Sequence, residues 1–342
     1  MPERAPVRSW LQRRWYEGSA PLPLLPLSAL YGAAVRLRRA AYGRGWLASR
    51  GPPVPVVVIG NLTVGGTGKT PLVIWLATAL REAGHWPGVV LRGYGGRVRT
   101  PRLVAPDDVA AAVGDEALLI ARRTDVPVAV AVDRAAAAGL LAGEGCTVVL
   151  SDDGLQHLAL RRDFSIVVVD GARGLGNGAL LPAGPLREPA SMLDGVDAVV
   201  IHGVDAHHVG RGREPLGMEL RPESLRELRP DREGSLDTLR GATVHAVAGI
   251  GHPQRFFALL RGLGARPIEH PFADHHAYRP RDLAFGDDLR IVMTEKDAVK
   301  CAPFADARMC CLRVAAKLPE SDAARLLCAI LARVTGGGIG RA

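Results

Sequence analysis

The stretch "VVVIGNLTVGGTGKTPLVIWLATAL", residues 56–80, restricts the possible fold more than any other part of the chain. An apolar run leads into a glycine-rich turn that ends in Gly68-Lys69-Thr70, and a helical pattern starts at Pro71. Such a strand, turn and helix form a phosphate-binding loop, in which backbone N–H groups at a helix N-terminus converge on phosphate oxygens. The stretch therefore predicts an α/β nucleotide-binding fold, with Lys69 on the outer phosphates and the Thr70 hydroxyl on Mg²⁺.

The loop departs from the strict G-x-x-x-x-G-K-[ST] pattern, because Thr63 stands at its first glycine. The core "GGTGKT" resembles the variant loop of the MinD and ArsA class, but Val64 takes the place of that class's signature lysine. A lysine-driven ATPase dimer is therefore not expected. The residues predicted to bind the nucleotide are Gly65, Gly66, Thr67, Gly68, Lys69 and Thr70.

Short apolar runs alternate with helical patterns from Val54 onward. Continuous apolar strands separated by helices are typical of a parallel sheet covered on both faces, which binds ligands at the carboxyl ends of its strands. The runs lie at 54–60, 87–91, 126–132, 146–152, 164–170 and 196–203, and the helical patterns at 71–83, 116–123 and 134–142. We predict a P-loop type of α/β fold with a mostly parallel sheet flanked by helices.

The composition changes after residue 205 and predicts a division of the chain. Residues 206–240 are polar, rich in Arg and Glu and without a sustained strand pattern, so we interpret them as a linker or hairpin. Residues 241–342 contain a second set of apolar runs and helical patterns, which predicts a smaller α/β domain that contributes to the active-site cleft. The P-loop core then spans 51–205, and residues 1–50 form an N-terminal arm.

The arm carries nearly all of the excess charge, with a net +7 of the total +8. It is also rich in aromatic residues, since it holds three of the five tryptophans and three of the five tyrosines. Its nine arginines are Arg4, Arg8, Arg13, Arg14, Arg36, Arg38, Arg39, Arg44 and Arg50, and its aromatic residues are Trp10, Trp15, Trp46, Tyr16, Tyr31 and Tyr42.

Rings and arginines around the apolar stretch "PLPLLPLSALYGAAV", residues 21–35, suit a membrane interface. This stretch is shorter than the roughly 20 residues of a spanning helix and is broken by three prolines. We therefore expect an N-terminal membrane-associated helix that lies on or dips into one leaflet. A signal peptide and a helix packed on the protein's own body are the alternatives.

Neither nucleic acid nor a protein partner is expected. All but four of the 43 basic residues are arginines, which a GC-rich genome explains, and outside the arm the chain is almost neutral. The prolines of the arm would make a poor groove-reading helix. The five cysteines are odd in number and form no C-x-x-C pair, so we expect a reducing, cytoplasmic setting with the thiols as small core residues.

A second acidic element is expected beside the phosphate loop. The apolar run "CTVVLSDD" ends in Asp152 and Asp153, and carboxylates there would hold and position Mg²⁺. Asp170, at the end of "IVVVD", is the competing candidate. A plain turn before Gly154 is the structural alternative, although adjacent carboxylates repel each other unless a cation offsets their charge.

These motifs make the chain similar to the tetraacyldisaccharide 4'-kinase family, the lipid A kinases. The similarity covers about residues 24–316. The motifs that carry it are "VVVIGNLTVGGTGKTP", "LRGYGGR", "VGDEALLIARR", "SDDGLQHLALRRD", "VDGARGLGNGALLPAGPLREP", "AVAGIGHPQRFF", "FADHHAY" and "MTEKDAVK". The resemblance implies transfer of the γ-phosphate of ATP to the 4'-hydroxyl of tetraacyldisaccharide-1-phosphate, with Mg²⁺, at the cytoplasmic face of the bacterial inner membrane.

The resemblance also implies roles for individual residues. Asp115 would be the catalytic base, assisted by His275 beside Asp274, since an attacking sugar hydroxyl must lose its proton. Without the resemblance, Asp115 would be interpreted as a helix N-cap after Gly114. His275 and His276 are not expected to share a metal ion, because neighbouring residues point to different sides of an element.

Further positions match the family near its active site. Arg187 is a candidate for holding the lipid's 1-phosphate or the transferring phosphoryl group, since arginine binds both through paired contacts. The other matched candidates for substrate contact or support are Tyr94, Glu116, Arg134, His157 and Glu188. A packed ring and a satisfied loop histidine are the ordinary interpretations of Tyr94 and His157.

The rival function is a P-loop GTPase or ATPase of the regulatory or metallochaperone type. Guanine recognition usually uses N-K-x-D after a strand. In "IVMTEKD" Thr294 replaces the asparagine and Lys296 is displaced by one position. This spacing favours ATP over GTP.

Overall fold

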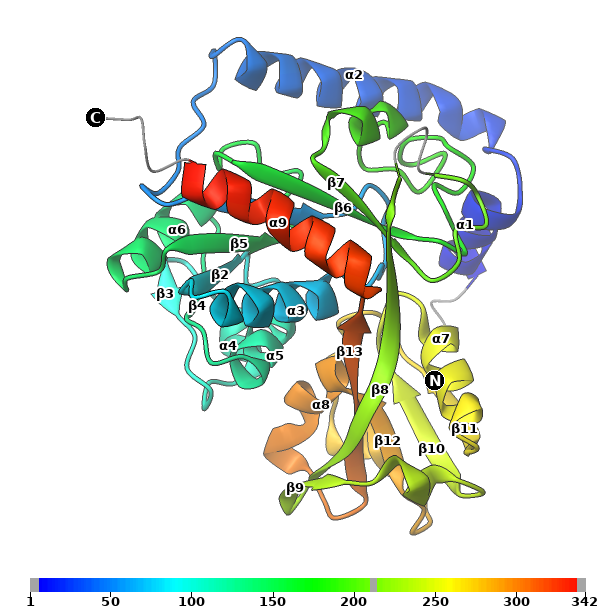
Figure 1. Ribbon diagram of the computed structural model, residues 1–342. Coiled ribbons are helices and arrows are strands. Elements are labelled where there is room, and N and C mark those ends of the chain that lie inside the picture. Colours follow the sequence, from blue (N-terminus) through cyan, green and yellow to red (C-terminus); the bar gives the residue numbers. More distant parts are fainter. Residues whose placement is uncertain (1–5, 210–213, 337–342) are drawn as a thin grey trace.

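The apolar runs of the sequence become strands of one sheet in a computed structural model that describes residues 6–209 and 214–336 (Figure 1). The strands are β1 (Val56–Gly60), β2 (Pro87–Leu91), β3 (Arg102–Leu103), β4 (Val128–Val130), β5 (Val148–Asp152), β6 (Phe164–Asp170), β7 (Ala198–His202), β8 (Leu216–Leu228), β9 (Asp231–Gly234), β10 (Thr243–Ala248), β11 (Arg266–Pro271), β12 (Ile291–Thr294) and β13 (Met309–Lys317). Their order is β11-β10-β12-β13-β8-β7-β6-β1-β5-β2-β4-β3, with β9 on β8. The fold is mixed α/β with a mostly parallel sheet, as predicted.

Helices cover the sheet as the alternating pattern predicts. They are α1 (Pro6–Glu17), α2 (Leu25–Gly43), α3 (Lys69–Glu82), α4 (Ala110–Val113), α5 (Asp115–Arg123), α6 (Arg134–Gly143), α7 (Pro253–Gly262), α8 (Glu295–Cys301) and α9 (Glu320–Gly336). Strand β1 shows why its run is continuously apolar: Val57 and Ile59 pack into one core, and Val56 and Val58 into another. A strand buried on both faces has no polar positions to alternate with.

Strand β8 joins the two halves of the chain. Its first residues, Leu216–Met218, pair in parallel with β7, and the following residues pair antiparallel with β13. The region 206–240, interpreted as a linker or hairpin without a sustained strand pattern, therefore contains a 13-residue strand that forms a hairpin with β9. The strand was missed because one of its faces is exposed and carries the charged residues that dominate its composition.

The C-terminal helix α9 returns to the first half. Leu326, Ile330 and Val334 share a core with Leu72 and Leu76 of α3. Figure 1 shows α9, in red, next to α3 rather than among the elements of the second half. Residues 241–342, predicted as one smaller domain, therefore divide: β10 to β13 form the smaller unit, and α9 packs on the larger one.

The arm forms α1 and α2, and α2 lies along the outside of the larger unit (Figure 1). Ser28 Oγ donates to the Leu180 carbonyl at 2.6 Å, and Tyr31 Oη donates to the Arg187 carbonyl at 2.9 Å. Several outward residues of α2 are apolar: Leu27 is 54% exposed and Leu30 68%. The helix thus packs on the protein's body and also presents an apolar outer face. Arg4, one of the nine arginines, lies outside the described residues.

Within the described chain no single helix is long and apolar enough to cross a membrane, although Trp10–Glu17 and Leu22–Gly43, bent by 96°, meet the length and composition requirement as a pair.

All five cysteines are free thiols. Cys146, Cys301, Cys310 and Cys311 are buried, as expected of small core residues, whereas Cys328 is exposed.

Candidate active site

The phosphate loop connects β1 to α3 at the carboxyl edge of the sheet. Gly65 and Gly68 have φ angles of 113° and 93°, which only glycine adopts without strain. Gly68 is the N-cap of α3, so the helix starts at Lys69 with its first N–H groups facing the loop. A helix N-terminus with such a loop is suited to bind phosphate oxygens.

The acidic pair at the end of β5 lies beside this loop. Thr70 Oγ1 donates to Asp152 Oδ2 at 3.2 Å, and Lys69 Nζ is 3.4 Å from Asp153 Oδ1. Burial and the charge of Glu116 raise the pKa of Asp152 well above its ordinary value. Burial would also raise the pKa of Asp153, but Lys69 and Arg187 outweigh it and hold that pKa below its usual range.

Asp152 is a fitting ligand for a cation. It is 2% exposed, and its Oδ1 has no hydrogen-bond partner among the described residues. A buried carboxylate oxygen without a partner is costly, and a divalent cation would offset both its charge and that of Asp153. The oxygens of Thr70, Asp152 and Asp153 are ligands that Mg²⁺ prefers.

Arg187 belongs to the same group of charges. Its guanidinium donates to Asp153 Oδ1 at 2.9 Å and to Oδ2 at 3.1 Å, and it contacts Asn61 Oδ1. Asn61 was not predicted: it also donates to the Thr63 carbonyl at 2.8 Å, inside the phosphate loop. Asn61 therefore connects Arg187 to the loop, a contact across 126 residues of sequence that no local pattern announces.

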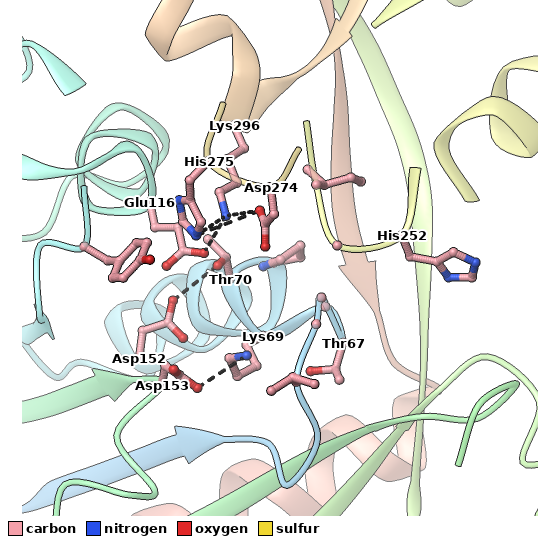
Figure 2. A pocket seen from close by; sticks show the side chains of 18 of the residues that line it. Thr67, Lys69, Thr70, Glu116, Asp152, Asp153, His252, Asp274, His275 and Lys296 are labelled. Carbon is pink, nitrogen blue, oxygen red and sulfur yellow. Dashed lines mark hydrogen bonds and ion pairs between the residues drawn. The ribbon is translucent and has the colours of Figure 1, made fainter. Parts of the chain in front are cut away.

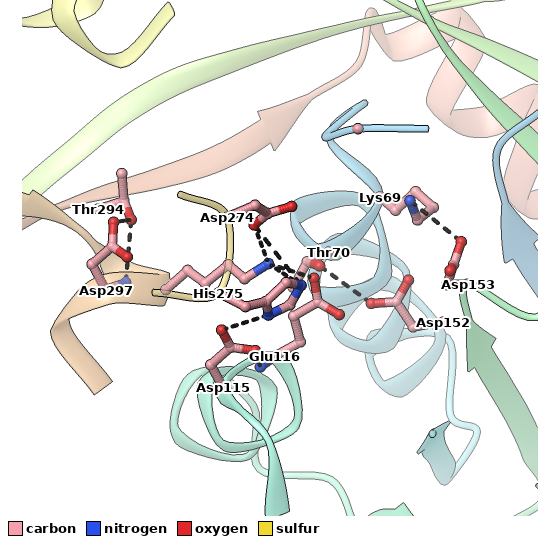
Figure 3. Close-up of polar contacts among 12 residues, drawn as sticks. Lys69, Thr70, Asp115, Glu116, Asp152, Asp153, Asp274, His275, Thr294 and Asp297 are labelled. Carbon is pink, nitrogen blue, oxygen red and sulfur yellow. Dashed lines mark hydrogen bonds and ion pairs between the residues drawn. The ribbon is translucent and has the colours of Figure 1, made fainter. Parts of the chain in front are cut away.

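Asp115 and His275 come together from different units. The imidazole Nδ1 lies 3.0 Å from Asp115 Oδ2 (Figure 3). Burial would raise the pKa of Asp115, but the hydrogen bond from His275 and the charge of Lys296 hold it below its ordinary value. Burial would lower the pKa of His275, and the hydrogen bond to Asp115 outweighs it, so that pKa is raised.

The N-cap interpretation of Asp115 does not describe its place in the helix. Gly114 occupies the N-cap, and Asp115 is the first residue of α5 with its carboxylate turned toward His275. Asp115 is 5% exposed, and of this pair only His275 lines the cavity. The imidazole is therefore the member of the pair that a substrate would meet.

Lys296 is a further site residue that was not predicted for this role. Its ammonium lies 3.0 Å from Glu116 Oε1, 3.3 Å from Asp274 Oδ1 and 3.2 Å from His275 Nε2. Figure 2 shows these four side chains grouped together, facing Thr70, Asp152 and Lys69. In the sequence, the lysine of the "TEKD" motif resembles only a guanine-recognition residue, and no local pattern predicts these partners.

The remaining predicted residues divide into two groups. Tyr94, Arg134 and His157 line the cavity, and the Tyr94 ring centroid is 4.6 Å from that of His275. Arg134 is buried, and burial lowers the pKa of His157 to about 4. Glu188 instead forms an ion pair with Arg39 of α2 at 3.3 Å, so in the described structure it supports the arm.

A cavity of about 1490 Å³ joins most of these parts. Its lining includes the phosphate loop, His275 and Lys296, and also Leu11, Trp15 and Tyr16 of the arm. The space therefore runs from the phosphate site to α1 of the arm. It is large enough for a nucleotide and a second substrate.

Two other aspartates have partners of their own: Asp170, the competing candidate at a strand end, and Asp297, the last residue of "IVMTEKD" in the guanine-recognition alternative. Asp170 contacts Arg255 and accepts from the Ala172 amide at 3.1 Å. Asp297 is fully buried and accepts from Thr294 Oγ1 at 2.6 Å and from the Gly249 amide at 2.8 Å. Asp297 is therefore engaged within the protein rather than open to a guanine base.

The loop after β10 packs on the phosphate loop. A Cβ atom added to Gly251 would lie 2.7 Å from the Gly66 amide nitrogen and 3.1 Å from Gly65 Cα. Gly251→Ala is therefore expected to displace the phosphate loop and to weaken ATP binding about tenfold, since overpacking costs about 1–3 kcal/mol. Calorimetric titration with ATP measures this. Gly262→Ala, where the added atom meets nothing within 4 Å, is the control; equal affinities of the two variants would contradict the expectation.

Comparison with known proteins supplies an independent observation. A family model described as Tetraacyldisaccharide-1-P 4'-kinase matches residues 20–332. A tetraacyldisaccharide 4'-kinase of Alkalilimnicola ehrlichii is 56% identical over 312 residues, covering 91% of this chain and 92% of that one. One of Xanthomonas axonopodis pv. citri is 49% identical over 316 residues, covering 90% and 92%. The crystal structure of "apo" form LpxK from Aquifex aeolicus in complex with ATP aligns with a TM-score of 0.76 at 30% identity, covering 91% of this chain and 98% of that one.

Proposed function

The chain belongs to the tetraacyldisaccharide 4'-kinase family and is an ATP-dependent kinase of lipid A biosynthesis, and we propose that phosphoryl transfer takes place between its phosphate loop and His275. The observation that supports this site is the shared cavity, which Lys69, Thr70, Asp152 and His275 all line. The phosphate-binding and proton-accepting groups thus face one space. The regulatory NTPase alternative is set aside by the family membership.

The proposed reaction uses these groups in fixed roles. The 4'-hydroxyl oxygen of the disaccharide attacks the γ-phosphorus of ATP, and the bond to the β-phosphate oxygen breaks to release ADP. The hydroxyl proton passes to the Asp115–His275 pair at His275 Nε2. Lys69 and Arg187 bind the oxygens of the transferring group, where negative charge is spread over three oxygens.

Mg²⁺ is the proposed cofactor of the acidic side of the site. Thr70, Asp152 and Asp153 would hold it, and when bound it offsets the charge of the transferring phosphoryl group. Mg²⁺ is usually held by one or two carboxylates plus substrate phosphates, so this small set of protein oxygens is sufficient.

The direct test is transfer of label from γ-labelled ATP to tetraacyldisaccharide-1-phosphate in detergent micelles, with Mg²⁺. Labelled bisphosphate product is expected. Hydrolysis of ATP without transfer to the lipid would contradict the proposed roles of these residues.

The arm is proposed to rest on the cytoplasmic face of the inner membrane, where the lipid substrate is embedded. Leu22, Leu27, Leu30 and Leu37 are all more than half exposed on the outer side of the arm. Exposed leucines with flanking arginines are suited to an anionic lipid surface. Aromatic and apolar residues of α1 line the cavity, which supports entry of the lipid from this side.

Leu27→Glu combined with Leu30→Glu is expected to lower partition onto anionic phospholipid vesicles roughly 100-fold or more, because burial of each leucine contributes about 1.5–3 kcal/mol. Vesicle sedimentation measures the bound fraction. The control is Val109→Glu combined with Val204→Glu, which changes two exposed apolar residues that are not part of the arm. If both double variants bound vesicles like the unmodified chain, the arm would be only a packed helix.

A further inference from the structure

Lys296 connects the smaller unit to α5 of the larger unit beside His275. Its ammonium has three N–H donors, and the structure gives it three acceptors: Glu116, Asp274 and His275. Glu116 is on α5 of the larger unit, next to Asp115. Lys296 itself is only partly accessible, with 16% of its side chain exposed.

The contact with Lys296 determines which nitrogen of His275 carries the proton. An ammonium has no lone pair and can only donate, so His275 Nε2 must accept. The proton of the neutral ring is then on Nδ1, which donates to Asp115 Oδ2 at 3.0 Å. This tautomer leaves on the cavity side a nitrogen that can take a proton.

We propose that Lys296 is a positioning residue of the kinase, which holds His275 as the Nδ1–H tautomer and keeps Nε2 unprotonated until the acceptor hydroxyl replaces the ammonium there. The inference rests on the proposed role of the Asp115–His275 pair. When the sugar hydroxyl takes the place at Nε2, Lys296 keeps Glu116 and Asp274 as partners. The proton of the hydroxyl then has a free acceptor at the moment of attack.

The charges around His275 support this role. Asp115 at 3.0 Å and Asp274 at 3.8 Å both favour the imidazolium, and Lys296 is the cation that opposes them. The Lys300 ammonium lies 3.9 Å from Asp115 Oδ2, and the Tyr94 ring packs against the imidazole. The charge of Lys296 lowers the pKa of His275, although the net pKa is raised. Without that charge more of the base would be protonated at neutral pH.

Lys296→Met is expected to move the acidic limb of the kcat/KM profile to higher pH by about one unit or more, the effect of removing one charge at contact distance. Activity would then fall at neutral pH and recover at alkaline pH. Lys296→Arg keeps the charge and is expected to restore the limb. A loss of activity of equal size at every pH would overturn the proposal, because it would indicate a structural role only.

Arg123→Met is the matched control, since Arg123 also bridges the two units, to Glu295 at 2.6 Å and Glu223 at 2.7 Å, and does not contact the imidazole. Its pH profile is expected to keep the acidic limb of the unmodified chain; a limb shifted as in Lys296→Met would contradict the assignment.

NMR of histidine labelled with ¹⁵N, with His275→Ala to assign the signal, reads the tautomer directly. An Nε2–H tautomer would overturn the inference even where Asp115 and His275 prove essential, whereas a fully active Asp115→Asn would overturn the proposed base itself.

Discussion

Asp115→Asn is expected to lower kcat by on the order of 10²–10⁴, because His275, which accepts the hydroxyl proton, loses the carboxylate that orients it and stabilises its charged form. The carboxylate accepts a hydrogen bond from His275 Nδ1–H and stabilises the imidazolium that forms when Nε2 takes the hydroxyl proton. The amide is nearly the same size but carries no charge, and it can present an N–H to the ring and reverse the tautomer. Both effects remove proton acceptance while the phosphate loop stays in place.

The measurement pairs steady-state kinetics with ATP affinity and the melting temperature. ATP affinity is expected to stay within about twofold, because Asp115 is away from the cavity lining. Asp125→Asn changes an exposed aspartate near the end of the same helix and serves as control. A joint fall of rate, affinity and melting temperature would instead indicate that Asp115 mainly supports the helix.

Lys69→Met is expected to reduce transfer by on the order of 10²–10³ or more, as for removal of one preorganised donor to a developing charge. Lys69 starts α3 and is 3.4 Å from Asp153. Its loss removes the cation on the outer phosphates and leaves Asp153 with Arg187 alone. The two acidic residues would then repel the nucleotide, so ATP affinity is expected to fall along with kcat.

Single-turnover transfer measured at saturating ATP separates the loss of rate from the loss of binding. Lys317→Met removes an exposed lysine at the end of β13 and is expected to keep full activity. Transfer by Lys69→Met at the rate of this control would contradict the assignment of the phosphate loop.

The strands of the larger unit could be predicted from the sequence because each is buried on both faces. Each of the six runs contains a strand, and the helical patterns at 71–83, 116–123 and 134–142 match α3, α5 and α6 within two residues at the start. Strand β8 could not be predicted in this way, since its charged exposed face hides the apolar one. The packing of α9 depends on contacts with α3 that are distant in sequence.

The candidate site likewise contains residues that local sequence patterns identify and residues that only contacts distant in sequence bring together. Lys69, Thr70, Asp152 and Asp153 stand in local patterns whose chemistry is visible in the sequence. Asp115 and His275 are 160 residues apart, so only the family resemblance brought them together before the structure did. Asn61 and Lys296 had no such signal, because their importance comes from partners on other elements.

The hydrogen bonds of α2 have a consequence for how the enzyme selects its acceptor. Tyr31 and Arg39 bind residues 187 and 188, and the Arg187 side chain contacts Asp153 in the site. With the arm on the lipid surface as proposed, the height of phosphoryl transfer above the bilayer is set by a rigid connection rather than by a flexible tether. On this proposal a lipid is selected by how far its acceptor hydroxyl stands above the membrane.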